Sequence, residues 1–279
     1  MSHRWACLFG QPVAHSLSPS LHNAAFAALG IDAHYEAREV GPGDLPRAVE
    51  ALRAADCLGA NVTAPHKQAM LALVDELSEE ARVLGALNTV VNQSGRLLGA
   101  NTDAAGLARW MRLSEIDPSG KSALVLGAGG AARSAVWALD ELGASSIVVL
   151  NRTPDRARLL VEALQPHLQQ ARLRNGDLRG AVVPPDQPYR VIINATSLGH
   201  HGSAPELDRG CYSRDSVAIE LVYNPPLTDF MVAARAAGAR TENGLGMLLH
   251  QAALAFERWT GQSPPIEVYE AVIRERVTA

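Results

Sequence analysis

The sequence predicts an α/β protein with two domains, in which an N-terminal α/β domain is followed by a Rossmann-like, doubly wound sheet. Three observations predict this fold class. The 279 residues exceed the usual size of one compact domain. Short apolar runs alternate with helical patterns along the chain. A glycine-rich turn at 127–132 lies directly between a strand pattern and a helix pattern.

The first domain is predicted over residues 1–103. Its strand patterns and its Ala- and Leu-rich helix patterns alternate, and they cover Ala6–Phe9, Pro19–Leu29, Leu45–Ala55, Leu58–Val62 and Val90–Asn92. A helix over Ala104–Leu113 follows, and the polar, turn-rich Ser114–Gly120 is interpreted as an interdomain linker.

The second domain is predicted over residues 104–245. A strand at Ala123–Leu126, a helix at Ala131–Leu142 and a strand at Ile147–Leu150 form one βαβ unit. Strand patterns at Val191–Asn194 and Val217–Leu221 extend it into a parallel sheet. Two further helices are expected in 246–279, at Gly246–Trp259 and Ile266–Val277, and they should pack back on the first domain and complete it.

Composition narrows the function classes. The chain is 47% apolar and 19% charged, with a net charge of −4 spread over interspersed residues, so it offers no broad positive field for nucleic acid. No apolar stretch is long enough for a membrane span or a signal peptide. The three cysteines and the adjacent His200 and His201 lack metal-ligand spacing, so no metal is expected. We expect a cytoplasmic monomer or homodimer that acts on a small molecule.

The glycine-rich turn is typical of a dinucleotide site. Its six residues, Gly127, Ala128, Gly129, Gly130, Ala131 and Ala132, fit the pattern G-x-G-x-x-G/A. Gly127 permits the tight turn, Gly129 lets the backbone approach a pyrophosphate, and Ala132 allows close packing of helix on strand. The helix N-terminus adds donors and positive potential. The alternative is a turn that only joins two elements.

The residues after the second strand of this unit favour NADP. Asn151, Arg152 and Thr153 stand where a site for NAD would place a carboxylate against the ribose hydroxyl. Guanidinium groups of Arg152 and Arg156 suit a 2′-phosphate instead, and Thr153 adds a hydroxyl donor. The alternative is that Arg156 and Arg158 belong to a solvated helix face, and for Arg158 this explanation is at least equally good.

A lysine is the best candidate for acid–base chemistry. Lys67 lies in the run Asn61-Val62-Thr63-Ala64-Pro65-His66-Lys67, where a strand ends and Pro65 is suited to the first turn of a helix. Among 25 Lys and Arg, only Lys67 and Lys121 are lysines. A lysine can exchange a proton with an alcohol or carbonyl oxygen, whereas an arginine cannot. The alternative is a plain surface charge.

Asp103 is the expected partner of this lysine. It begins the helix that leads to the second domain, and its carboxylate could pair with Lys67 while accepting a hydroxyl of the substrate. A helix cap is an equally good explanation of Asp103.

The chain resembles the shikimate dehydrogenase family. The motifs that carry the resemblance follow the family's order along nearly the whole chain: Ser16-Leu17-Ser18-Pro19 with His22-Asn23, NVTAPHK, GALNT, NTDAAG, GAGGAAR, Asn151-Arg152-Thr153, INATSLG at Ile192–Gly199, Val222-Tyr223-Asn224-Pro225, and NGLGMLL at 243–249 with Gln251.

The resemblance implies reversible, NADP-dependent reduction of 3-dehydroshikimate to shikimate, a step toward chorismate and the aromatic amino acids. It implies that Lys67 and Asp103 are the catalytic pair and that Ser16 and Ser18 bind the substrate carboxylate. The remaining implied contacts are Thr63, Asn88, Asp103, Gln251 and Tyr223 for the substrate and Thr196, Leu221 and Gly244 for the cofactor.

The sequence departs from the family pattern at two places. His200-His201 stands where Gly-Met is frequent, and Glu220 stands where an aspartate is common. Both changes bear on contacts near the nicotinamide, including the role of Leu221, where Met is frequent. Two alternatives stay open: a quinate/shikimate or aminoshikimate dehydrogenase, and a non-catalytic NADP-binding regulator.

Overall fold

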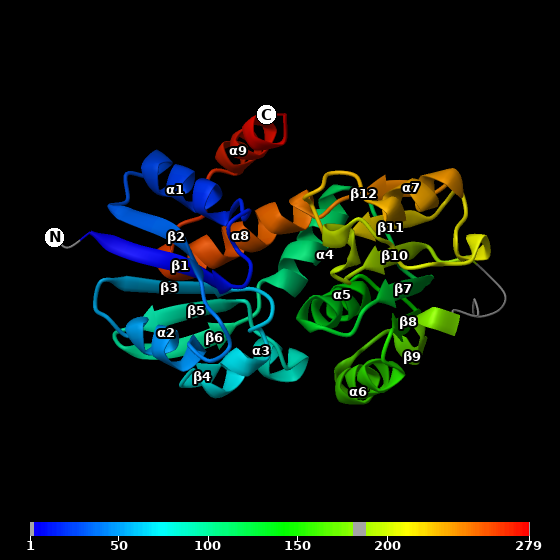
Figure 1. Cartoon of the computed structure of the whole chain (residues 1–279), viewed down its shortest axis with the longest axis horizontal. Coiled ribbons are helices and arrows are strands. Elements are labelled where there is room, and N and C mark those ends of the chain that lie inside the picture. The colour runs from blue at the N-terminus through cyan, green and yellow to red at the C-terminus, as the bar shows by residue number, and fades with distance from the viewer. Residues whose placement is uncertain (1–2, 181–187, 279) are drawn as a thin grey trace. The chain divides into compact units, whose positions relative to one another are not determined.

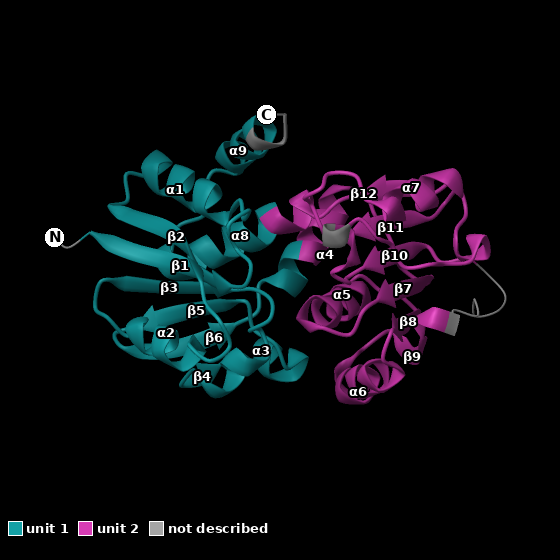
Figure 2. Cartoon of the chain, in the orientation of Figure 1, with its two compact units in different colours: residues 1–106, 249–279 teal, residues 107–248 magenta. Residues whose placement is uncertain are grey.

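The computed structural model describes residues 3–180 and 188–278, and the chain divides into two compact units. The first unit contains residues 1–106 and 249–279, and the second contains residues 107–248 (Figure 2). The chain passes between the units twice, within helix α4 (Asp103–Leu113) and within helix α8 (Leu245–Thr260). Each unit has its own six-stranded sheet (Figure 1).

The sheet of the first unit is mixed. Its strands are β1 (Arg4–Gly10), β2 (Ala33–Glu39), β3 (Cys57–Val62), β4 (Glu76–Leu77), β5 (Thr89–Gln93) and β6 (Arg96–Ala100), in the order β2-β1-β3-β5-β6-β4. Strands β1, β2 and β3 are parallel, whereas β5 runs antiparallel to both β3 and β6. The helices of this unit besides α4 and α8 are α1 (Ser18–Ala28), α2 (Leu45–Ala51), α3 (Glu79–Leu84) and α9 (Ile266–Thr278).

Successive strand residues point to opposite faces of this sheet, so apolar side chains on both faces need helices to cover them. Cys7 and Phe9 of β1 pack in one cluster with apolar residues of α2. Elsewhere in the unit, the ring of Phe26 in α1 packs on Phe256 in α8 with centroids 5.0 Å apart. Helix α9 also packs on α1. The prediction that the C-terminal helices return to the N-terminal part of the chain is confirmed.

The sheet of the second unit is entirely parallel. Its strands are β7 (Ser122–Leu126), β8 (Ser146–Asn151), β9 (Arg172–Asp177), β10 (Val191–Asn194), β11 (Val217–Glu220) and β12 (Arg240–Glu242), in the order β12-β11-β10-β7-β8-β9. Helices α5 (Gly130–Glu141), α6 (Pro154–Leu164) and α7 (Asp229–Ala236) pack on it. This is the Rossmann order, in which the strand order reverses between β7 and β10. The predicted fold class is confirmed.

The segment 114–120 is not the linker that the sequence suggested. It lies inside the second unit, and the chain leaves the first unit earlier, within the continuous helix α4. Backbone pairing explains this, since Gly120 N donates to Gly143 O at 2.8 Å and ties the segment to the turn after α5. Among the described residues, no helix is long and apolar enough to cross a membrane.

Candidate active site

A tight hairpin brings two polar motifs together in the first unit. Strands β5 and β6 are joined by Ser94 and Gly95, both with positive φ (57° and 91°), as two-residue hairpin turns require. The register pairs Thr89 with Ala100, so the residues just before β5 and just after β6 are neighbours. Asn88 N donates to Ala100 O at 3.1 Å. The hairpin thus places Asn88 beside residues 101–103.

Lys67 reaches the same place from the end of β3. The structure places it in a turn before the short 3-10 helix η1 (Ala69–Ala72), so the prediction that Pro65 lies in the first turn of a helix carrying Lys67 is wrong. The backbone groups of this turn bond to neighbouring segments instead. Leu87 N donates to Lys67 O at 2.9 Å, and the His66 ring lies 2.6 Å from Val40 O. These contacts fix the lysine beside the start of β5.

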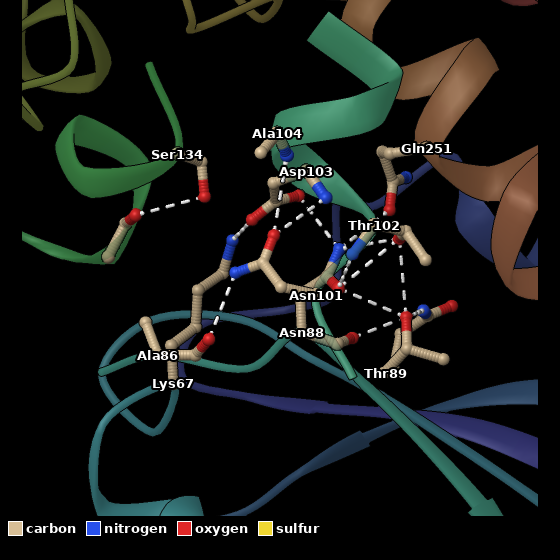
Figure 3. Close-up of polar contacts among 12 residues, drawn as sticks. Lys67, Ala86, Asn88, Thr89, Asn101, Thr102, Asp103, Ala104, Ser134 and Gln251 are labelled. Carbon is tan, nitrogen blue, oxygen red and sulfur yellow. Dashed lines mark hydrogen bonds and ion pairs between the residues drawn. The ribbon is translucent and has the colours of Figure 1, made fainter. Parts of the chain in front are cut away.

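Lys67 and Asp103 form an ion pair (Figure 3). The Lys67 side chain is 17% exposed and the Asp103 side chain 5% exposed, so both charges are largely removed from water. Removing either partner of such a pair leaves an uncompensated buried charge. The two groups therefore depend on each other for charge compensation, and the lysine keeps the larger exposed surface of the two.

The helix cap of α4 comes from Asn101 rather than Asp103. Asn101 Oδ1 accepts from the backbone N–H groups of Asp103 and Ala104, at 3.0 and 3.3 Å. That leaves the carboxylate of Asp103 free to bond elsewhere. Of the two sequence-based explanations of Asp103, the ion pair is the one that the structure contains, and Asn101 is the cap that the sequence analysis missed.

Asn88 holds the second oxygen of this carboxylate. Its Nδ2 donates to Asp103 Oδ1 at 2.8 Å, and its Oδ1 accepts from Thr102 N at 2.7 Å (Figure 3). A backbone N–H can only donate, so the contact with Thr102 fixes which end of the amide faces Asp103. Thr89 Oγ1, which is buried, donates to the same Asn88 oxygen at 3.1 Å. The orientation of Asn88 is fully determined by its neighbours.

Gln251 joins this cluster from α8. Its Oε1 accepts from Asn88 Nδ2 at 3.2 Å. The contact depends on close packing of α4 and α8, because a Cβ added at Gly106 would lie 2.6 Å from Gln251 N. Gly106, in the run NTDAAG, is therefore a site-forming residue that the sequence analysis did not single out.

The other predicted substrate residues are near polar turns. Ser16 Oγ accepts from Ser18 N at 3.2 Å, so the serine pair also forms the turn before α1. Thr63 follows β3 directly and is half-buried, and Tyr223 in the second unit is also half-buried. Their roles toward a substrate stay predictions.

The glycine-rich turn of the second unit needs glycine at one position and leaves open space at another. Gly127 has φ +108°, and a Cβ there would lie 3.0 Å from Ala195 O, so glycine is required. Gly129 is the N-cap of α5, makes no side-chain cap and has open space where a Cβ would be. Ala132 is fully buried against the sheet. The free N–H groups at the start of α5 suit a pyrophosphate.

The arginines after β8 are solvent-exposed. Asn151 Nδ2 donates to Thr153 O at 2.9 Å and shapes the turn that carries Arg152. Within the described residues, Arg152 and Arg156 form no ion pair and can turn toward an anion. Arg158 instead pairs with Asp155 and with Glu162, at 3.4 and 2.8 Å, as the solvated-face explanation predicts.

The ends of β10, β11 and β12 lie against one another. Thr196 Oγ1 donates to Asn194 Oδ1 at 2.7 Å. A Cβ at Gly244 would lie 2.1 Å from Leu221 O, so only glycine permits this approach. The side chains of His200 and His201 are not part of the described structure. Across the described residues, no three His, Cys, Asp or Glu side chains are grouped as metal ligands.

A parallel sheet in the Rossmann order, a glycine-rich turn between a strand and a helix N-terminus, and a largely buried lysine–carboxylate pair define the class of pyridine-nucleotide-dependent dehydrogenases. Three family profiles match the chain. They are the shikimate dehydrogenase substrate binding domain over residues 8–90, shikimate/quinate 5-dehydrogenase over 112–197, and the shikimate 5′-dehydrogenase C-terminal domain over 244–274.

Similar proteins point the same way. The shikimate dehydrogenase (NADP+) of Moorella thermoacetica is 43% identical over 98% of this chain and 93% of its own length. The crystal structure of shikimate 5-dehydrogenase from Thermus thermophilus in complex with NADP(H) and shikimate is 40% identical, with TM-score 0.86 over 98% of this chain and 99% of that one. The quinate dehydrogenase of Corynebacterium glutamicum in complex with NAD is 30% identical, with TM-score 0.86 over 98% and 99% of the two chains. The chain belongs to the shikimate dehydrogenase family.

Proposed function

We propose that the protein is an NADP-dependent shikimate dehydrogenase, which reversibly reduces 3-dehydroshikimate to shikimate on the route to chorismate and the aromatic amino acids. One observation carries the proposal: the buried ion pair of Lys67 and Asp103, held by Asn88, in a chain about two-fifths identical to shikimate dehydrogenases over nearly its whole length. NADPH, when bound, supplies the hydride.

The chain's own part in the reaction is proton transfer and orientation. Lys67 donates a proton to the carbonyl oxygen at C3 during reduction and takes it back from the hydroxyl during oxidation. Asp103 holds the ammonium group in place and can accept a hydrogen bond from a neighbouring ring hydroxyl. Because Asn88 and Lys67 each bond to one oxygen of Asp103, the carboxylate has little freedom to turn away.

The substrate residues are proposed from the family pattern and from their chemistry. Ser16 and Ser18 supply hydroxyl donors for the carboxylate. Thr63, Asn88, Asp103, Gln251 and Tyr223 are the proposed contacts for the rest of the ring. Asn88, Asp103 and Gln251 are already hydrogen-bonded together, which supports a common role.

The cofactor residues are proposed in the second unit, with 104–245 as the NADP domain and 1–103 with 246–279 as the substrate and catalytic domain. Gly127, Ala128, Gly129, Gly130 and Ala131 cradle the pyrophosphate. Asn151, Arg152, Thr153 and Arg156 receive the 2′-phosphate, and Thr196, Leu221 and Gly244 contact the nicotinamide half. The open space at Gly129 supports the first assignment, and the second is supported by the guanidinium groups of Arg152 and Arg156, which form no ion pair with any residue that the structure describes. A cytoplasmic location and a monomeric or homodimeric state stay predictions of the sequence.

The test is absorbance at the nicotinamide band with shikimate and NADP, then with NAD, then with quinate. We expect strong reduction with shikimate and NADP. Lys67→Ala should lower kcat by about 10²- to 10⁴-fold, the usual contribution of a general acid–base group. Lys121→Ala is the matched control, because Lys121 is the chain's other lysine, is exposed and lies in the second unit.

Each alternative has its own outcome. Faster turnover with quinate and NAD would identify a quinate-preferring paralogue. Measurable NADP binding without turnover of shikimate, quinate or aminoshikimate would favour a non-catalytic regulator. Equal activity losses in Lys67→Ala and Lys121→Ala would remove Lys67 from the mechanism.

A further inference from the structure

Glu220 is a carboxylate that the proposed reaction does not use, yet it is fully buried. It is the last residue of β11 and has 0% exposed surface. Burial raises the pKa of this carboxyl, and hydrogen bonds from its neighbours oppose the rise. No basic side chain among the described residues forms an ion pair with it. Such a group is costly to bury, so its hydrogen bonds are the features that explain its place.

The hydrogen bonds of Glu220 join three segments. Oε2 accepts from Asn194 Nδ2 at 2.8 Å and from Thr228 Oγ1 at 3.0 Å, and Oε1 accepts from Val222 N at 3.2 Å. Asn194 ends β10, Val222 follows β11, and Thr228 is the N-cap of α7. Figure 1 shows these three elements side by side in the second unit. One carboxylate therefore ties two strand ends to the start of a helix.

The segments that it joins are those that continue into the proposed nicotinamide contacts. With Nδ2 held by Glu220, the Oδ1 of Asn194 accepts both from Thr196 N at 3.1 Å and from Thr196 Oγ1 at 2.7 Å. A Cβ at Gly199 would lie 3.1 Å from Glu220 Oε2, so the turn after Thr196 also packs on the carboxylate.

In a Rossmann sheet the dinucleotide lies across the point where the strand order reverses, with one nucleotide on each half. Here the glycine-rich turn follows β7 and the arginines follow β8. Glu220 lies on the other half of the sheet, where it is hydrogen-bonded at the ends of β10 and β11. We propose that Glu220 is a positioning residue for the nicotinamide half of NADP, which acts by holding loops 195–199 and 221–223 without touching the cofactor. The inference rests on the proposed function.

The test separates the two halves of the cofactor. Glu220→Gln keeps the shape but puts an N–H group where one of the donors points. We expect it to weaken NADPH binding about tenfold, as one mismatched buried polar contact does, while the affinity for 2′,5′-ADP stays within about twofold. NADPH binding is followed by its fluorescence and 2′,5′-ADP by displacement, so neither readout needs catalysis.

Asp140→Asn is the matched control. Among the described residues of this unit, Asp140 is the other buried carboxylate, and the hydrogen bonds found for it come from the backbone N–H groups of residues 169–171. A general loss of stability would weaken both ligands in both variants alike, and that result would overturn the proposal. Unchanged NADPH binding in a folded Glu220→Gln protein would overturn it as well.

A second pair of variants covers the case in which Glu220→Gln does not fold. Thr228→Val removes one donor to the carboxylate, and Thr228→Ser keeps both that donor and the α7 cap. The proposal expects selective loss of NADPH affinity with valine and recovery with serine. Equal behaviour of the two variants would contradict it. If the unmodified protein failed to bind NADPH at all, the proposed function itself would fall.

Discussion

At the scale of single residues, His22 shows how far burial can change a side chain. It is completely buried, and its ring lies among those of Tyr35, Phe256, Trp259 and Tyr269, with centroids 4.5 to 6.1 Å away. The Tyr269 hydroxyl lies 3.2 Å from its Nδ1. Burial lowers the pKa of His22 from 6.5 to about 3. The imidazole is therefore neutral in the folded protein at any pH near neutrality.

This shift predicts a loss of stability in acid. Because the folded pKa lies below the unfolded value, the unfolded chain binds more protons, and stability falls as the pH drops from about 6.5 toward 3. The slope that one such group adds is at most about 1.4 kcal/mol per pH unit. The free energy of unfolding, measured with urea between pH 7 and pH 4, should fall less steeply with decreasing pH in His22→Gln than in the unmodified protein.

The control is His15→Gln, since His15 is exposed in the same unit. Its curve should run parallel to that of the unmodified protein. Parallel curves for all three proteins would mean that His22 does not titrate differently in the folded and unfolded chains. The prediction concerns how steeply the free energy of unfolding changes with pH. A loss of stability in His22→Gln that is the same at every pH does not affect it.

At the scale of elements, the close packing of α4 on α8 brings Asp103 and Gln251 to Asn88. A Cβ at Gly106 would meet the backbone of Gln251 at 2.6 Å, and backbone cannot move aside as a flexible side chain can. Gly106→Ala should therefore push α8 away from Asn88 and cost about 1–3 kcal/mol of unfolding free energy. We also expect a raised KM for shikimate, because Gln251 loses its place. Chemical denaturation and steady-state kinetics measure the two effects.

Gly43→Ala is the control for this substitution. Gly43 has nothing within 4 Å of an added Cβ, so Gly43→Ala tests the change in backbone freedom without a steric clash. An unchanged KM and stability in Gly106→Ala would show that the two helices can separate without cost.

The strands illustrate which elements the sequence predicts. The apolar runs predicted seven interior strands close to their observed bounds, namely β1, β3, β5, β7, β8, β10 and β11. All four edge strands, β2, β4, β9 and β12, were missed, as was β6. Edge strands have one partner and reach solvent, so sequences such as AHYEARE and RLRNGD carry polar residues that resemble loops. The Ser94-Gly95 turn was the available signal for β6.

At the scale of the whole molecule, ligand binding should stabilise the fold. A ligand that binds only the folded chain raises the free energy of unfolding by about 2.7 kcal/mol when its concentration is 100 times its Kd. For a chain of 279 residues, that raises the melting temperature by about 4–5 °C. NADP should give this shift, and NAD at the same concentration a smaller one, because only NADP offers the arginines a 2′-phosphate. Thermal melts followed by circular dichroism measure both.

Arg152→Ala should reduce the NADP shift toward that of NAD, whereas Arg158→Ala should leave it nearly unchanged, since Arg158 is already paired on the helix surface. Equal shifts with NAD and NADP in the unmodified protein would remove the basis for the proposed phosphate contact.

Local features of the sequence were enough to predict the dinucleotide turn, the strand–helix units around it, and Lys67 as the acid–base candidate. These features are glycine positions within six residues, hydrophobic periodicity, and the difference between lysine and arginine. The motif order also led to the family.

The partners of the polar side chains depended on the folded chain. The hairpin register put Asn88 against Asp103, Asn101 took the helix cap, and α8 brought Gln251 from the far end of the chain. The buried bonds of Glu220 appear only once β10, β11 and α7 are side by side. A buried polar atom must find a partner, and which partner it finds depends on segments that are distant in sequence and adjacent in the fold.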